Sequence, residues 1–205
     1  MVEHHLEEQA RITLTERLRG LFKQPLERIG FFVYSLGVKP NWITLFGLIG
    51  TMIGAYYISQ GNLVAGGIII FIMGPFDALD GAVARAGNEV TKFGAFIDSV
   101  SDRYIEIMIY GGILWYFLSE QNSIGVLLTF LASAGSVLVS YNRARAQSLG
   151  METKVGILTR FERMLVIGPS LIFSQPLIGV ALVAILANIT ALQRIYHVKH
   201  QADAQ

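Results

Sequence analysis

The sequence predicts an all-α integral membrane protein, with six transmembrane helices and an amphipathic helix at the membrane interface near the N-terminus. Three observations predict this fold class. Hydrophobic residues make up 53% of the 205 residues, and the mean hydropathy is +0.51. The chain has no cysteine, which argues against a disulfide-stabilised secreted domain. Beyond residue 40, apolar runs long enough to cross a bilayer follow one another with short interruptions.

These apolar runs define the six expected helices. The fifth is too short to span a bilayer alone, so we expect it to extend back through Thr159 and Arg160, with arginines reaching toward the interface. Small residues every third or fourth position in the first run, at Gly47, Gly50 and Gly54, favour close helix packing. The six helices are expected over residues 41–60, 63–85, 94–118, 123–147, 161–174 and 177–196.

The first 39 residues form a separate cytoplasmic or interfacial segment in this interpretation. Leu14, Leu18 and Phe22 follow helical spacing while basic residues occupy the other faces, which predicts an amphipathic helix on the inner leaflet. Pro25 should kink or restart it. A solvated N-terminus fits residues 1–10 better. Residues 40–199 would form one domain, and residues 200–205 a cytoplasmic tail.

The distribution of basic residues predicts the orientation in the membrane. The three short connections at 61–62, 119–122 and 175–176 contain no Lys or Arg, and all sixteen basic residues lie elsewhere. Since cytoplasmic loops carry the excess of Lys and Arg, both termini are expected in the cytoplasm. The expected location is the cell membrane, with the loop near residue 90 on the cytoplasmic side.

Four carboxylates lie within 26 residues, in the pattern Asp77-x-x-Asp80-Gly81-x-x-Ala84-Arg85, eight residues, and Gly94-x-x-x-Asp98-x-x-x-Asp102. Charged groups in a bilayer are costly and usually serve chemistry or ion binding. Steps of three and four residues place each pair on one helix face, so a hairpin would let all four converge on hard divalent cations. A structural salt-bridge network would leave negative charge uncompensated, because few bases are nearby.

This pattern resembles that of the CDP-alcohol phosphotransferase family, with every fixed position present. The resemblance implies a metal-dependent enzyme that joins a CDP-activated alcohol to an acceptor hydroxyl and releases CMP. It implies two Mg²⁺ ions, with Mn²⁺ as a substitute, held by Asp77, Asp80, Asp98 and Asp102. Asp102 would also act as general base toward the acceptor. A homodimer is expected by the same analogy.

The CDP-lipid is expected to lie against the first half of this motif. The small residues Gly81 and Ala84 let a pyrophosphate approach the backbone, and Arg85 can pair with phosphate. Asn41, after Pro40, has the character of an N-cap, whereas the family resemblance makes Asn41 and Thr44 nucleotide contacts. CDP-diacylglycerol and CDP-archaeol are both compatible with the sequence.

A second element, Ser140-Tyr141-Asn142-Arg143-Ala144-Arg145-Ala146 followed by Gly156-x-x-x-Arg160-x-x-Arg163, resembles the phosphatidylinositol-phosphate and archaetidylinositol-phosphate synthase branch. There the basic residues bind inositol phosphate. The resemblance implies an acceptor-phosphate site of Ser140, Arg143, Arg160 and Arg163, with phosphatidylinositol phosphate and CMP as products. Many branch members have Lys at position 143, so glycerol 3-phosphate, the acceptor of phosphatidylglycerol-phosphate synthases, stays an alternative.

Two further interpretations concern other residues and another class of protein. Glu106 has no assigned role and is expected to face the cavity or to pair with Arg103. A cation transporter could also use intramembrane acids, but transporters place them near the midplane of repeated architectures. Here the acids cluster toward one face and no repeat occurs. Nothing in the sequence indicates a nucleic-acid partner.

Overall fold

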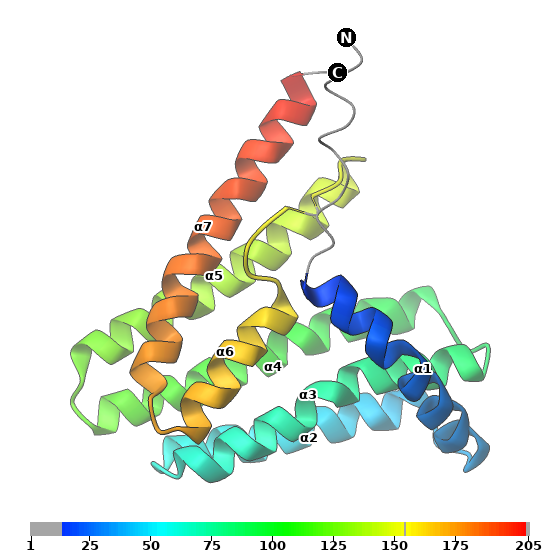
Figure 1. Cartoon of the computed structure of the whole chain (residues 1–205), viewed down its shortest axis with the longest axis horizontal. Coiled ribbons are helices and arrows are strands. Elements are labelled where there is room, and N and C mark those ends of the chain that lie inside the picture. Colours follow the sequence, from blue (N-terminus) through cyan, green and yellow to red (C-terminus); the bar gives the residue numbers. More distant parts are fainter. Residues whose placement is uncertain (1–13, 154, 204–205) are drawn as a thin grey trace.

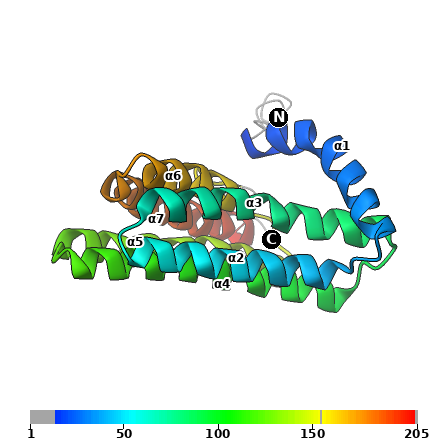
Figure 2. The same cartoon turned by 90° about the horizontal axis from the view of Figure 1, so that it is seen from below.

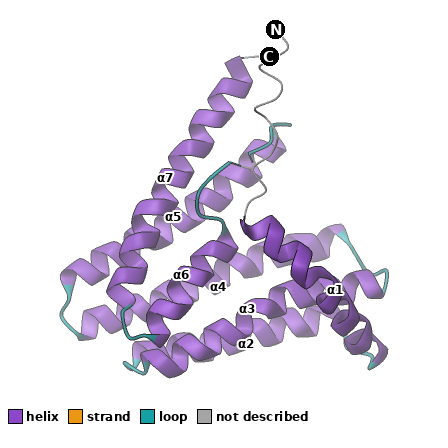
Figure 3. Cartoon of the chain, in the orientation of Figure 1, coloured by secondary structure: helices purple, strands orange, loops and turns teal. Residues whose placement is uncertain are grey.

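The chain folds into helices joined by short connections, as a computed structural model of residues 14–153 and 155–203 shows (Figures 1 and 3). For residues 14–23 and Asp77 it describes the backbone alone. No strand occurs within these ranges. The helices are α1 (Leu14–Ser35), α2 (Pro40–Ser59), α3 (Leu63–Ala86), α4 (Lys92–Ser119), α5 (Ser123–Ser148), α6 (Arg160–Ile172) and α7 (Pro176–Asp203).

The six helices predicted over the apolar runs are all present, with most ends within two residues of the prediction. The last one differs, because α7 runs on to Asp203, past the predicted end at 196. Within the described part of the chain, four helices, α2, α3, α5 and α7, are by length and composition apolar enough to cross a membrane. The 13-residue α6 is only about 20 Å long, shorter than a hydrocarbon core.

Short turns join α2 to α3, α4 to α5 and α6 to α7, at the end of the molecule opposite the loop near residue 90. Each contains a residue in the left-handed region, namely Gly61 (φ 81°), Gln121 (φ 54°) and Ser174 (φ 55°). Asn122 caps α5 by accepting from the Gly125 N–H over 2.9 Å. These reversals make successive helices antiparallel, so the predicted outer connections lie together.

Helix α2 begins two residues earlier than an Asn41 cap requires. Lys39 is the N-cap, Pro40 is the first helical residue, and the exposed Asn41 follows it. The expected capping role of Asn41 is therefore wrong. The fixed φ of proline is already that of a helix and its missing N–H costs nothing at this position, so the helix starts at Pro40.

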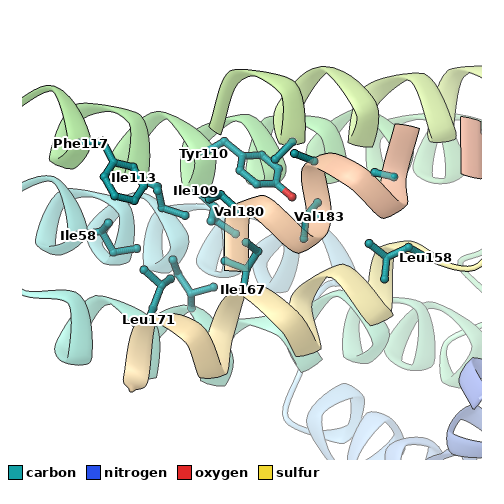
Figure 4. Packing of buried hydrophobic residues seen from close by; sticks show 14 of the residues in the cluster. Ile58, Ile109, Tyr110, Ile113, Phe117, Leu158, Ile167, Leu171, Val180 and Val183 are labelled. Atoms are coloured by element: carbon teal, nitrogen blue, oxygen red, sulfur yellow. The ribbon is translucent and has the colours of Figure 1, made fainter. Parts of the chain in front are cut away.

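Helices α2, α3 and α4 lie side by side, while α5 pairs with α7 and α6 packs between α3 and α7 (Figure 1). Gly47, Gly50 and Gly54 all face α3, as predicted: a Cβ on Gly54 would come within 2.9 Å of Ile70. The buried core draws residues from every helix from α2 to α7, and Figure 4 shows part of it; its fully enclosed members include Ile58, Ile113, Leu171, Val180 and Val183.

Helix α1 lies across α3, as seen in Figure 2. It continues through Pro25, and its contact point is Gly30, where a Cβ would lie 2.8 Å from the Ala82 Cβ and 2.9 Å from the Ala82 carbonyl carbon. Its outer face exposes Ile29, Phe31 and Phe32. The apolar pattern predicted for Leu14 to Phe22 concerns side chains outside the described set, and residues 1–13 lie outside it altogether.

Candidate active site

The hairpin predicted from the carboxylate motif is formed by the end of α3 and the start of α4. Asp77 and Asp80 lie in the last three turns of α3, and Asp98 and Asp102 lie in the first three turns of α4. Thr91 begins α4 by accepting from the Gly94 N–H over 2.9 Å. The loop between the helices is therefore only residues 87–91, which keeps both pairs of acids at one end of the molecule.

The side chain of Asp80 is nearly buried and accepts a hydrogen bond from a residue of α2. Its exposed fraction is 6%, and Thr44 Oγ1 donates to its Oδ2 over 2.5 Å. Because Thr44 lies one turn into α2, the start of that helix packs on the motif, as the expected nucleotide contacts require. Asn41 is exposed in the first turn of α2, and Arg85 is exposed in the last turn of α3.

Next to Asp80, the residues Gly81 and Ala84 have small side chains, so the backbone of the motif is accessible there. A Cβ on Gly81 would lie 3.3 Å from Arg85 Nη1, and Ala84 is partly accessible. The opposite face of the same segment is covered by α1. There Tyr34 lies so close to Gly87 that any larger residue at position 87 would collide with its ring. The end of α3 thus packs against α1 on one side and is accessible on the side of Gly81, Ala84 and Arg85.

Asp102 lies between two guanidinium groups. It is 8% exposed, Arg103 Nη2 donates to its Oδ2 over 3.1 Å, and Arg160 Nη1 lies 2.5 Å from its Oδ1. Arg160 comes from the first turn of α6, 58 positions further along the chain. The structure therefore brings one predicted acceptor arginine directly to the predicted general base.

Arg163 is placed differently from the expectation of an acceptor-phosphate contact. Its exposed fraction is 2%, and its Nε and Nη2 both donate to Glu106 Oε1, over 2.9 and 2.5 Å. Its Nη1 donates to the Leu158 carbonyl over 3.3 Å. Of the two expectations for Glu106, the pair with Arg103 is wrong, because Arg103 bonds Asp102 and Glu106 bonds Arg163. Glu106 does line a small buried cavity. Arg103 and Glu106 are three residues apart, but Arg163 enters from α6 and takes the buried oxygen.

Ser140 and Arg143 lie one turn apart near the end of α5, so they share a helix face. Ser140 is half-buried and Arg143 is exposed. The neighbouring Asn142 Nδ2 donates to the Ala191 carbonyl over 3.2 Å, which ties this turn of α5 to α7. The predicted Ser140–Arg143 element is therefore accessible and held against the last helix.

Arg194 on α7 is a candidate that the sequence interpretation missed. It is 4% exposed, and it donates to two carbonyls: Nε to Val155 over 3.1 Å and Nη1 to Val139 over 2.5 Å. Among the described residues no carboxylate lies within ion-pair distance of it, and its charged neighbours Arg143 and Arg163 repel it. A buried cation without a carboxylate partner is costly, and here the two backbone carbonyls are the acceptors that hold it. Its place at the polar end of the last apolar run, directly after Gln193, did not distinguish it from an anchoring arginine.

Helix α7 also fixes the linker between α5 and α6. Thr190 Oγ1 accepts from the Ile157 and Leu158 N–H groups, both over 3.2 Å. Gly156 has φ 136°, and a Cβ there would collide with Thr190. This explains the glycine at the head of the predicted basic element. Position 154 is outside the described residues.

The model of the CDP-alcohol phosphatidyltransferase family matches residues 38–194. The chain belongs to this family. It is 41% identical over 191 residues to the archaetidylinositol phosphate synthase of Pyrococcus horikoshii, covering 93% of this chain and 99% of that protein. It is 30% identical to the phosphatidylinositol phosphate synthase of Mycobacteroides abscessus, over 82% of this chain and 80% of that protein.

Solved structures agree with this assignment. The crystal structure of Mycobacterium tuberculosis phosphatidylinositol phosphate synthase with CDP-DAG bound has a TM-score of 0.78 and 28% identity, covering 84% of this chain and 92% of that one. The same enzyme in complex with manganese and citrate also has a TM-score of 0.78 and 28% identity, over 84% of this chain and 88% of that one. The chain is thus a membrane enzyme of the CDP-alcohol phosphatidyltransferase family.

The donor chemistry of the family motif suits a hard divalent cation. Asp80, Asp98 and Asp102 offer carboxylate oxygens, the ligand type that Mg²⁺ and Mn²⁺ prefer. Among the side chains that the structure describes, no three acidic, His or Cys groups are drawn together as a metal cluster. The side chain of Asp77, the fourth expected ligand, is outside that set.

Proposed function

We propose that the protein transfers a phosphatidyl group, or its ether-lipid equivalent, from a CDP-lipid to the hydroxyl of a phosphorylated polyol, with inositol 1-phosphate as the acceptor. The products are phosphatidylinositol phosphate, or the archaeol analogue, and CMP. The observation that carries the proposal is the buried Arg194, which lies close to Arg143 without a carboxylate partner. A cationic site beside an acidic motif suits an acceptor that itself carries a phosphate.

In this mechanism the CDP-lipid lies over Gly81 and Ala84, with Arg85 on the pyrophosphate and Asn41 and Thr44 at the nucleotide. Asp77, Asp80, Asp98 and Asp102 would hold two Mg²⁺ ions, with Mn²⁺ as a substitute. Such ions neutralise the pyrophosphate and stabilise the departing CMP when bound.

The remaining chemistry belongs to the acceptor side. Arg143, Arg160 and Arg194, with Ser140, bind the phosphomonoester and orient the attacking hydroxyl. Asp102 accepts the hydroxyl proton as the oxygen bonds to the lipid phosphorus. The bond from this phosphorus to the bridging oxygen breaks, and CMP leaves with that oxygen. Arg163 takes a supporting position behind Arg160 in place of the phosphate contact expected for it.

A head-to-head acceptor assay tests this proposal. Purified protein is given CDP-diacylglycerol and Mg²⁺ with inositol 1-phosphate, glycerol 3-phosphate, free inositol or serine, and CMP and lipid products are measured. Inositol 1-phosphate should be consumed fastest. Preference for glycerol 3-phosphate would replace the acceptor but keep the mechanism. Absence of CMP with every acceptor would overturn the proposed reaction.

We also propose six membrane-embedded helices, including the charged α4 and the short α6, with the motif facing the cytoplasm. The absence of Lys and Arg from the connections at 61–62, 119–122 and 175–176 supports this orientation. A single cysteine at the exposed Asn62 should react with an impermeant reagent from outside, and one at the exposed Glu89 only from inside. The opposite labelling pattern would invert the topology. The homodimer and the domain limits given above stay predictions.

A further inference from the structure

Two ion pairs connect α4 to the start of α6. Asp102 and Glu106 are four residues apart on α4, and Arg160 and Arg163 are three apart on α6, so each set shares one helix face. Asp102 pairs with Arg160, and Glu106 pairs with Arg163. We call the first the outer pair and the second the inner pair.

The two pairs differ in exposure. In the outer pair the side chains are 25% exposed for Arg160 and 11% for Asp102. In the inner pair they are 2% exposed for Arg163 and 6% for Glu106. The cavity beside the inner pair is about 10 Å³, lined by Tyr110 and Ile167 among others. That is room for about one water and too little for a phosphate group. Because the carboxylate of Glu106 already neutralises Arg163 and the adjoining cavity is too small for a phosphate, the inner pair does not bind the acceptor anion.

The inner pair acts on the turn that carries Arg160. Arg163 bonds both Glu106 and the Leu158 carbonyl, which lies just before the helix start. The same turn is closed by Glu162, whose carboxylate accepts from the Thr159 N–H over 2.5 Å. Through Arg163 the first turn of α6 is thus bonded to a buried point on α4.

We propose that Glu106 and Arg163 are positioning residues: their buried pair fixes the first turn of α6 against α4, so that Arg160 stays within reach of Asp102 and of the acceptor phosphate. This inference rests on the proposed function for its kinetic consequences. The Arg160 guanidinium has to contact both the base and the incoming anion, so the helix turn that carries it must be held in place. The buried Glu106–Arg163 pair, with two hydrogen bonds, holds this turn.

Kinetics with CDP-diacylglycerol, Mg²⁺ and inositol 1-phosphate test the proposal. E106Q should raise the acceptor KM by about 10-fold, as expected for a second layer of contacts, while the CDP-lipid Kd changes by less than about 2-fold. R163K should keep more activity than R163A because it retains the charge. E120Q, at the exposed far end of α4, is the matched control and should behave as wild type.

The decisive arm combines E106Q with R160A. If Glu106 acts through Arg160, E106Q should leave the acceptor KM of R160A unchanged. An equal rise in KM in both backgrounds would overturn the positioning role. Should E106Q fail to fold, E106L/R163M replaces both charges together and avoids an uncompensated buried charge. The same comparison with R160A then applies.

A second measurement is independent of activity. Thermal unfolding of D102N, R160Q and their double variant gives the coupling within the outer pair. This coupling should be present in the wild-type background and lost with E106Q. Coupling that persists would overturn the inference. Loss of coupling in a protein that transfers to no acceptor would uphold the inference and overturn the proposed function.

Discussion

The acidic and basic halves of the site are assembled in different ways. The four acids come from one stretch, Asp77 to Asp102, folded into a single hairpin. The arginines come from three helices: Arg143 from α5, Arg160 and Arg163 from α6, and Arg194 from α7. The acids gain their proximity from one short loop, whereas the arginines gain theirs from packing between distant segments.

The two halves also differ in how their charges are balanced. Asp80 accepts a hydrogen bond from Thr44, and Asp102 lies against Arg103 and Arg160. Arg194 is buried against backbone carbonyls, with no carboxylate within ion-pair distance among the described residues. This contrast indicates separate tasks, with cations and pyrophosphate on the acidic side and the acceptor's anion on the basic side.

The largest effect is expected on the acidic side. Asp80→Asn should lower metal-dependent CDP-lipid binding and turnover by more than about 100-fold, because losing a direct ligand should exceed the cost of losing its supporting contacts.

Asp102→Asn should reduce turnover more than binding, since it removes the proton acceptor. Binding is measured by calorimetry and turnover by CMP release. Near-normal turnover in Asp102→Asn would remove its role as base.

On the basic side, Arg194→Gln should raise the acceptor KM by about 10-fold or more, the value of a hydrogen bond to a charged group. CDP-lipid binding should change by less than about 2-fold, because the lost contact is on the other half of the site. Lys199→Gln, on the exposed end of α7, is the control. If CDP-lipid binding falls as much as acceptor binding, the two halves are not separate.

Thr44→Val tests the support behind Asp80. Valine keeps the shape but loses the hydrogen bond to Asp80, so metal-dependent CDP-lipid binding should weaken by about 10-fold. Thr51→Val is the matched control, because Thr51 Oγ1 bonds only the Gly47 carbonyl of its own helix, over 2.8 Å. Equal losses in the two variants would show that the effect belongs to α2 as a whole.

The smallest effect concerns the contact of α1 with the motif helix. Gly30→Ala should lower the unfolding midpoint by a few degrees, because its Cβ would lie 2.8 Å from the Ala82 Cβ and the helices must separate. Gly111→Ala on α4 meets open space and should be neutral or slightly stabilising. An acceptor KM that rises in Gly30→Ala would show that α1 acts on both halves.

The sequence by itself determined the helices and the acidic half. Apolar runs and turn residues define most helix ends to within two residues, because helix formation and reversal depend on neighbours along the chain; the end of α7 at Asp203 is the exception. The motif from Asp77 to Asp102 could be interpreted for the same reason: residues three or four apart share a helix face, and one short loop brings the two pairs together.

Only the tertiary structure decided the basic half and its support. The family resemblance gave Arg163 to the acceptor, and the sequence left Glu106 either facing the cavity or paired with Arg103. Arg163 is instead buried against Glu106, and Arg194 lies near Arg143 although the two are 51 positions apart. Such pairings depend on which faces of α4, α5, α6 and α7 pack together. A buried charge takes its partner from whichever helix closes over it, and its own sequence neighbours carry no record of that choice.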